Sequence, residues 1–329
     1  MCVLAIDIGG TGTKLACAKM IGSHLELSDV QIFASDSYES LESIIEEYQH
    51  ESQHKCASIS IAVAGPVASD RCKLTNLPWT IEGRAIADRF KIKELKLLND
   101  LEAQGHAVAH LEDIESVNIH GKFNRQGNIA IVAPGTGLGE AFVCRTPQGG
   151  FLPVASEGGH CDFSPTNATE MALLEFVKRK HKRVSWERII SGGMGFINIY
   201  EFFIDSQRYQ WDRDLDDAKR HSASAFAREL FRLGKEDLLI AKEVLNLYCE
   251  LLGAEAGNLI LKVMATGGLV LSGGVTPHLL PFLDDTPFYH RFTHKGRFSD
   301  MLSEVPIVAI TDKNVGIKGA ALAAINPSV

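Results

Sequence analysis

The stretch MCVLAIDIGGTGTKLACAKM, residues 1–20, decides how this chain folds. Two short apolar runs, VLAIDI at 3–8 and LACAKM at 15–20, flank a cluster of glycines. Short apolar runs bounded by glycine are typical of buried strands. A dinucleotide-binding fingerprint needs G-x-G-x-x-G at the start of a helix, and a P-loop needs G-x-x-x-x-G-K-[ST] there. Neither spacing is present, so the sequence predicts a β-hairpin with a glycine turn.

This first turn has the composition of a phosphate site. Glycine permits a positive φ and a close approach of backbone N–H groups to an anion. Asp7, at the end of the first strand, is expected to hold Mg²⁺, through water. A plain hairpin turn is the alternative. The predicted phosphate-binding residues here are Asp7, Gly9, Gly10, Thr11, Gly12, Thr13 and Lys14.

Two further glycine turns follow later in the chain. The segment PGTGLG at 134–139 again lies between two apolar runs, and SGGV at 272–275 ends the run LVLS and opens a helical pattern. Two such turns facing one cleft would grip a triphosphate from both sides, and the third would pack against a nucleoside. The sequence predicts ATP contacts at Gly135, Thr136, Gly137, Gly139, Gly273 and Gly274.

Composition limits the class of protein. The 329 residues carry a formal charge of -8, with 45% hydrophobic and 22% charged residues, as in an ordinary globular protein. This charge balance argues against a nucleic-acid or anionic-membrane surface, and no stretch is apolar enough for a membrane helix. The seven scattered cysteines include no C-x-x-C pair, which predicts reduced thiols in a cytosolic protein.

Strand patterns dominate up to about residue 165, and helical patterns dominate from 169 to 264. The last of these helical patterns runs from Glu236 to Met264 and carries charges, which favours a long helix outside the membrane. The segment 206–221 mixes arginine and aromatic residues with many acids, and we expect it to be a solvated loop.

The order of the three turns resembles the actin-like ATPase and sugar-kinase superfamily. LKLLNDLEAQGHAV (95–108), ASEGGHCDFSP (155–165) and SWERIISGG (185–193) are similar to segments of bacterial glucokinases. LTNLPWTI (74–81), GGVTPHLLPF (273–282) and FTHKGRFSDMLSEVPI (292–307) extend the resemblance to nearly the whole chain.

This resemblance implies an α/β, two-domain actin-like ATPase (ribonuclease-H-like) fold with an active-site cleft between the domains. We expect a small α/β domain at 1–110 plus 312–329 and a large α+β domain at 111–311. The implied activity is ATP-dependent phosphorylation of the C6 hydroxyl of glucose in the cytoplasm. The implied partners are ATP, Mg²⁺, glucose and a second copy of the chain in a homodimer.

The resemblance also assigns residues to the sugar. Asp100 would be the catalytic base for the C6 hydroxyl, a role that suits a carboxylate at the carboxyl end of a strand. By its sequence context alone, Asp100 would instead be a helix cap. The implied sugar-binding residues are Asn99, Asp100, Glu157, His160 and Glu187.

The chain departs from the family pattern in the first turn. Bacterial glucokinases usually have Asn and Arg where this chain has Gly12 and Lys14. The related ROK family holds zinc with a Cys-x-Cys-Gly cluster, whereas this chain has His160-Cys161, so no structural zinc is expected. A kinase of another hexose or amino sugar, or a non-catalytic sugar sensor, remains the alternative function.

Overall fold

The computed structural model describes residues 2–9, 12–52, 56–74, 77–284 and 287–325. The chain packs as two compact units. Unit 1 comprises Met1–Ser116, Ala141–Ala155 and Asp312–Val329, and unit 2 comprises Val117–Glu140 and Ser156–Thr311. The contacts thus assign 111–116 and 141–155 to unit 1, whereas the sequence placed them in the larger domain. One reason is close packing at Gly105, where an added Cβ would lie 2.7 Å from Cβ of Pro153.

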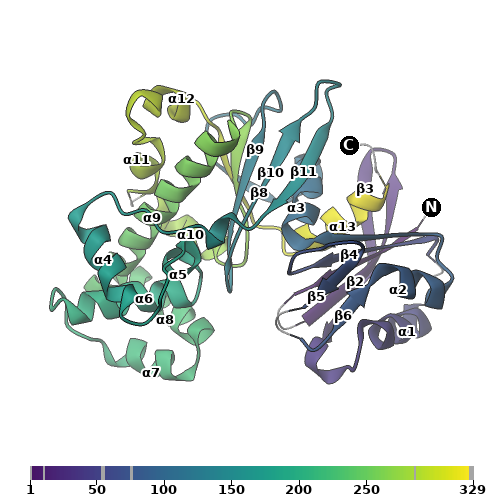
Figure 1. Ribbon diagram of the computed structural model, residues 1–329, viewed down its shortest axis with the longest axis horizontal. Coiled ribbons are helices and arrows are strands. Elements are labelled where there is room, and N and C mark those ends of the chain that lie inside the picture. The colour runs from purple at the N-terminus through teal and green to yellow at the C-terminus, as the bar shows by residue number, and fades with distance from the viewer. Residues whose placement is uncertain (1, 10–11, 53–55, 75–76, 285–286, 326–329) are drawn as a thin grey trace. The chain divides into compact units, whose positions relative to one another are not determined.

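Unit 1 is built on a five-stranded sheet (Figure 1). Its strands are β1 (Val3–Ile8), β2 (Gly12–Ile21), β3 (His24–Ala34), β4 (Ser58–Val63) and β7 (Glu94–Asn99), in the order β3-β2-β1-β4-β7. β1, β2 and β3 form an antiparallel meander, and β4 and β7 add in parallel to β1. The predicted hairpin of residues 3–20 is confirmed. β5 (Arg71–Lys73) and β6 (Thr80–Glu82) form a separate ribbon.

Alternation along β1 gives the sheet its two apolar faces. Leu4, Ile6 and Ile8 pack with α1 (Leu41–Ser52) and with Ile86 of α2 (Gly83–Phe90). Ala5 packs on the opposite face with α3 (Asp100–Val108) and α13 (Val315–Ile325), among many other alanines. These small side chains let α3 and α13 approach each other closely. Gly319 lies so near the carbonyl of Ala103 that a Cβ at this position would not fit. The C-terminal helix therefore completes unit 1 (Figure 1).

A second sheet has six strands. Its strands are β8 (Ser116–His120), β9 (Ile129–Pro134), β10 (Leu138–Arg145), β11 (Phe151–Ser156), β12 (Gly268–Leu271) and β13 (Ile307–Ile310), in the order β11-β10-β9-β12-β13-β8. β12 runs parallel to both of its neighbours, β9 and β13.

Unit 2 carries most of the helices. They are α4 (Ala168–Lys178), α5 (Trp186–Ile190), α6 (Met194–Asp205), α7 (Arg213–His221), α8 (Ala223–Lys235), α9 (Leu239–Val263), α10 (Thr276–Leu283), α11 (Phe288–Thr293) and α12 (Ser299–Ser303). The buried helix α9 contributes many side chains to the largest apolar core among the described residues. No helix in the described part of the chain is both long and apolar enough to cross a membrane.

Two expectations from the sequence are wrong in detail. The segment 206–221 is not all loop, because α7 forms there: the Asp212 side chain accepts from the N–H groups of Asp214 and Leu215, and Leu215 is fully buried. The cysteines are not all reduced, because the pairing of β1 with β2 brings Cys2 and Cys17 into a disulfide. The free cysteines are Cys56, Cys72, Cys144, Cys161 and Cys249.

Candidate active site

The first glycine turn joins β1 and β2 in unit 1. The N–H of Gly9 donates to the carbonyl of Gly12 at 3.0 Å and closes the turn. A Cβ on Gly12 would lie 3.3 Å from the carbonyl oxygen of Phe33, so β3 lies directly against the turn on that side. The predicted contacts Gly10 and Thr11 lie outside the described residues.

Asp7 and Lys14 pair across β1 and β2 next to this turn. The Asp7 carboxylate is half-buried. It packs so closely against Gly316 that a Cβ on Gly316 would not fit. Burial raises the pKa of Asp7, and the positive charge of Lys14 partly offsets that rise. The ammonium of Lys14 itself donates to the carbonyl of Lys313 at 2.5 Å and to Asn314 Oδ1 at 3.1 Å.

Two residues predicted to touch phosphate thus have structural partners. Lys14 ties β2 to the segment that leads into α13, and Thr13 is fully buried, with its hydroxyl 2.9 Å from the Ser35 hydroxyl. Asp7 lies at the strand end beside the N-terminus of α13, where the partial positive charge of a helix end favours a carboxylate.

The Asn99–Asp100 pair lies where β7 becomes α3. Asn99 is the cap of this helix: its Oδ1 accepts from the N–H of Leu101 at 2.9 Å and of Glu102 at 3.3 Å, and its Nδ2 donates to the carbonyl of Gly65 at 3.1 Å. Asp100 is the first residue of α3 and is half-buried. The reading of Asp100 as the cap is therefore wrong, and its carboxylate is not needed to begin the helix.

The second glycine turn joins β9 and β10 in unit 2. The N–H of Gly135 donates to the carbonyl of Gly137 at 2.9 Å, so the turn spans only Gly135, Thr136 and Gly137. Gly139, predicted to belong to the turn, lies inside β10.

The third turn packs against the second. Gly273 has φ +80°, and a Cβ there would lie 2.5 Å from the carbonyl oxygen of Pro134. The N–H of Val275 donates to that same carbonyl at 3.2 Å. Gly274 has open space around its Cα, with no heavy atom within 4 Å of an added Cβ.

Substituting these two glycines compares a constrained position of the turn with an unconstrained one. Gly273→Ala should destabilise the protein by about 2–4 kcal/mol, because alanine is strained at positive φ and its methyl group meets a backbone oxygen. Gly274→Ala should change the free energy of unfolding by less than about 0.5 kcal/mol. Urea unfolding of both variants measures the difference, and equal losses would show that the backbone of this turn is not constrained as described.

A fourth glycine segment was missed in the sequence. The N–H of Gly192 donates to the carbonyl of Gly135 at 2.7 Å, and Val275 leaves no room for a Cβ on Gly192. The signal was present, because Ser191-Gly192-Gly193 repeats the tripeptide Ser272-Gly273-Gly274. Three glycine segments of unit 2 therefore meet at one place.

A pocket of about 650 Å³ opens at this meeting point, a volume in the usual range for ligand sites. Gly135, Thr136 and Gly274 of the predicted ATP residues line it, whereas Gly137, Gly139 and Gly273 do not. The remaining lining residues are Gly192, Gly193, Met194, Ala223, Ser224, Ala227, Arg228, Phe231, Arg232, Lys235, Val275 and His278.

One wall of the pocket is a face of α8. Phe231 stacks with His278 of α10, with the ring centroids 5.4 Å apart and the ring planes at 26° to each other. Arg232 forms ion pairs with Glu229 and Glu236. Arg228 lines the same wall and has no hydrogen-bond or ion-pair partner among the described residues. The wall thus combines a flat apolar surface with a cation available to an anionic ligand.

Three predicted sugar-binding residues meet in unit 2. His160 Nδ1 lies 3.3 Å from Glu187 Oε2, and His160 Nε2 lies 3.8 Å from Glu157 Oε2. Glu157 directly precedes the turn η3 (Gly158–His160), His160 is its last residue, and Glu187 lies in α5. All three side chains retain exposure to solvent. They form an acceptor-rich cluster that suits the hydroxyls of a polyol.

This cluster borders the second glycine turn. A Cβ on Gly137 would lie 3.0 Å from Glu187 Oε1. The same turn lines the 650 Å³ pocket through Gly135 and Thr136. Within unit 2, the turn therefore has the carboxylate cluster at one end and the pocket at the other.

Glu140 lies beneath this cluster, and no sequence motif marks it. Its side chain is 1% exposed, and neither carboxylate oxygen has a hydrogen-bond partner among the described residues. Its carboxyl group packs against Gly158 so closely that a Cβ has no room there. Burial raises the pKa of Glu140 to about 8, with a further rise from the charge of Glu255 and a partial offset from Lys262.

The chain matches known proteins over nearly its whole length. The family model described as Glucokinase matches residues 4–327. A glucokinase of Synechocystis sp. (strain PCC 6803) is 34% identical, over 98% of this chain and 97% of that protein.

Solved structures have the same fold. The crystal structure of glucokinase from an Antarctic psychrotroph, 28% identical, superposes with a TM-score of 0.85 over 99% of both chains. A ROK family glucokinase from Streptomyces griseus, solved in complex with glucose and AMPPNP, has a TM-score of 0.66 at 16% identity over 99% of this chain and 100% of that one. The fold is that of sugar kinases in the actin-like ATPase superfamily. The match over nearly the whole length shows that the chain belongs to the glucokinase family.

Proposed function

We propose that this protein transfers the γ-phosphoryl group of ATP to the C6 hydroxyl of glucose. The observation that carries the proposal is the position of the Gly135–Gly137 turn, which borders both the Glu157–His160–Glu187 cluster and the 650 Å³ pocket. A kinase needs its acceptor site and its nucleotide site to be this close, because the phosphoryl group passes directly between them.

The pocket of unit 2 suits the nucleoside part of ATP. A base packs on the Phe231–His278 surface, and the phosphates extend toward the glycine turns, whose N–H groups favour anions. Arg228 supplies a positive charge on the same wall. The first turn, between β1 and β2 of unit 1, is proposed to contact the terminal phosphates.

Mg²⁺ fits at Asp7. Magnesium in kinases is usually held by one or two carboxylates together with substrate phosphates and water. Asp7 offers one half-buried carboxylate at the glycine turn. The ion would neutralise negative charge on the phosphates, and Lys14 is directed away toward Lys313 and Asn314.

Asp100 is proposed to accept the proton of the C6 hydroxyl. As that oxygen forms its bond to the γ-phosphorus, the bond from phosphorus to the ADP oxygen breaks, and ADP leaves with the electron pair. Since the transition state of phosphoryl transfer is loose, the main role of Asp100 is to orient the hydroxyl and take its proton late. Asn99 fixes the start of α3 and so positions Asp100.

Substitution of Glu157 tests the proposed sugar cluster. We expect Glu157→Gln to raise the KM for glucose about tenfold, because an amide replaces a charged hydrogen-bond acceptor, and to leave the KM for ATP within about twofold. Asp162→Asn is the matched control, since Asp162 is exposed and pairs with Arg183 instead. Steady-state kinetics with each substrate varied in turn gives both constants. Equal changes in the two KM values would remove Glu157 from the sugar site.

Glucose specificity is tested with a panel of sugars. Purified protein, ATP and Mg²⁺ are incubated with glucose, mannose, fructose, galactose, glucosamine and N-acetylmannosamine, and ADP release is followed by a coupled assay. We expect kcat/KM to be highest for glucose. A higher value for another sugar would identify a different kinase, and sugar binding without ADP release would identify a sensor.

On family resemblance we propose a cytosolic homodimer, which light scattering of the purified protein would test.

A further inference from the structure

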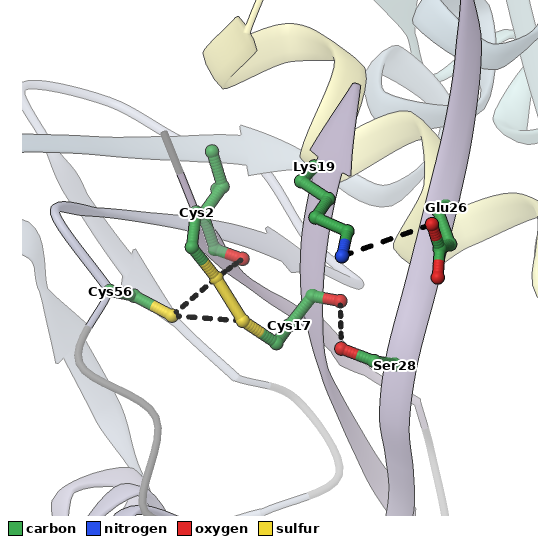
Figure 2. Close-up of a disulfide and its surroundings, with 7 residues drawn as sticks. Cys2, Cys17, Lys19, Glu26, Ser28 and Cys56 are labelled. Atoms are coloured by element: carbon green, nitrogen blue, oxygen red, sulfur yellow. Dashed lines mark hydrogen bonds and ion pairs between the residues drawn. A yellow bond between two sulfur atoms is a disulfide. The ribbon is translucent and has the colours of Figure 1, made fainter. Parts of the chain in front are cut away.

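We propose that Cys2, Cys17 and Cys56 form a redox site of unit 1, in which the Cys2–Cys17 disulfide is reversibly reduced and exchanges with Cys56 as a third thiol. Figure 2 shows the three sulfur atoms turned toward one another. The Cys56 Sγ lies 3.1 Å from the Cys2 Sγ and 3.4 Å from the Cys17 Sγ. The site is separate from the residues assigned to phosphoryl transfer.

The sheet itself brings the three residues together. Cys2 directly precedes β1, Cys17 lies on β2 opposite Leu4, and Cys56 lies two residues before β4. The N–H of Ala57 donates to the carbonyl of Cys2 at 3.0 Å and so holds the segment of Cys56 beside the start of β1. Cysteines on or just before three neighbouring strands thus lie at the same end of the sheet.

The surroundings limit access to the cluster from outside. Cys17 is buried, whereas Cys2 and Cys56 are half-buried. An external thiol therefore reaches the pair through Cys2 or Cys56 and not through Cys17. Burial raises the pKa of the Cys56 thiol to about 11, so Cys56 is mainly a thiol at neutral pH, and exchange through its thiolate should speed up as the pH rises toward that value.

Each step balances in atoms and electrons. For exchange, Cys56 loses its proton, its thiolate attacks the Cys17 Sγ, and the Cys2 thiolate leaves and takes up a proton, with no net oxidation. For formation from the reduced protein, the oxidant is a small-molecule disulfide such as oxidised glutathione. Cys2 attacks it and expels one thiolate, and Cys17 then attacks the Cys2 Sγ and expels the second.

The disulfide stabilises the sheet that carries the first glycine turn. It closes a separation of 15 residues between the start of β1 and the middle of β2. Closing such a loop restricts the unfolded chain, so the oxidised protein is expected to melt about 5–10 °C above the reduced protein. Reduction would therefore loosen this hairpin while leaving the glycine turn itself intact.

Variants in which one cysteine is replaced by serine test the site. Wild-type protein, Cys2→Ser, Cys17→Ser, Cys56→Ser and the control Cys144→Ser are reduced, equilibrated with oxidised glutathione, alkylated in denaturant and mapped by mass spectrometry. Cys144 is a free cysteine of β10 outside the cluster. We expect Cys2–Cys17 in the wild type, the control and Cys56→Ser. Cys2→Ser should form Cys17–Cys56, and Cys17→Ser should form Cys2–Cys56.

Two results would overturn the proposal. One is the absence of any internal disulfide in both Cys2→Ser and Cys17→Ser under conditions that oxidise the wild type. The other is one equivalent of tightly bound zinc in the purified wild-type protein, absent from all three cluster variants, which would make the cluster a metal site. A melting temperature that rises on oxidation in the wild type and in Cys144→Ser, but not in the double variant Cys2→Ser/Cys17→Ser, which keeps only one thiol of the cluster, would support it.

Discussion

Replacing Asp100 by asparagine is expected to lower kcat by about 10²- to 10⁴-fold, because the amide cannot accept the proton of the C6 hydroxyl. Glucose and nucleotide binding should stay within about threefold of the wild type, since asparagine keeps the size of the side chain and one acceptor oxygen. Steady-state kinetics and calorimetric titration with glucose measure the two effects separately.

The local structure indicates that this substitution leaves the start of α3 unchanged. Asn99, not Asp100, caps α3, and the Asp100 Oδ1 that accepts from the N–H of Leu101 has a counterpart in asparagine. We therefore expect the free energy of unfolding to change by less than about 1 kcal/mol. Glu102→Gln, which changes another acid of the same helical turn, should keep full activity. A kcat for Asp100→Asn within about threefold of the wild type would eliminate Asp100 as the base.

Replacing Glu140 by glutamine is expected to change how stability depends on pH. The pKa of Glu140 is about 8 in the folded protein and near 4.5 when unfolded, so the folded state binds one more proton over the interval between them. Stability therefore falls as pH rises through this interval. From pH 5.5 to 7.5 this group alone should lower the free energy of unfolding by about 2–3 kcal/mol.

Glu140→Gln removes that proton equilibrium and keeps the shape of the side chain. The variant should gain about 2–3 kcal/mol over the wild type at pH 7.5 relative to their difference at pH 5.5. Urea unfolding of both proteins at the two pH values provides the measurement. Glu175→Gln, an exposed acid paired with Lys178, should give no such change. Parallel pH profiles for Glu140→Gln and the wild type would show that Glu140 is ionised in the folded protein.

The position of Glu140 connects this titration to the sugar cluster. Its carboxyl group lies against Gly158, between Glu157 and His160 in the sequence, so ionisation places a negative charge directly beneath that turn. We expect this charge to weaken the η3 turn before it affects the pocket on the other side of Gly135 and Thr136.

The strands and glycine turns could be predicted from the sequence because their signals are local. VLAIDI, KLLND and IAIVA are short apolar runs that end at glycine, asparagine or proline, and β1, β7 and β9 lie there. The sugar cluster was found by resemblance, and the structure brings three of its five residues, Glu157, His160 and Glu187, into contact. Asn99 and Asp100 lie in unit 1, and their meeting with the sugar remains a prediction.

The features that were missed depend on contacts between distant segments. Phe231 and His278 are 47 positions apart and form one wall only because α8 and α10 pack together. Cys2, Cys17 and Cys56 show no spacing motif, and only the strand pairing places their sulfur atoms together. Lys14 and Thr13 look like phosphate ligands in the sequence, but Lys313, Asn314 and Ser35 are their partners in the fold.

A crystal structure with glucose and a non-hydrolysable ATP analogue tests the central claim most directly. We predict the nucleoside on the Phe231–His278 wall and the phosphates at Gly135 and Thr136. Glucose should contact Glu157, His160 and Glu187, with its C6 hydroxyl within hydrogen-bond distance of Asp100. A nucleotide bound away from the glycine turns, or a sugar with its C6 hydroxyl remote from Asp100, would contradict the account.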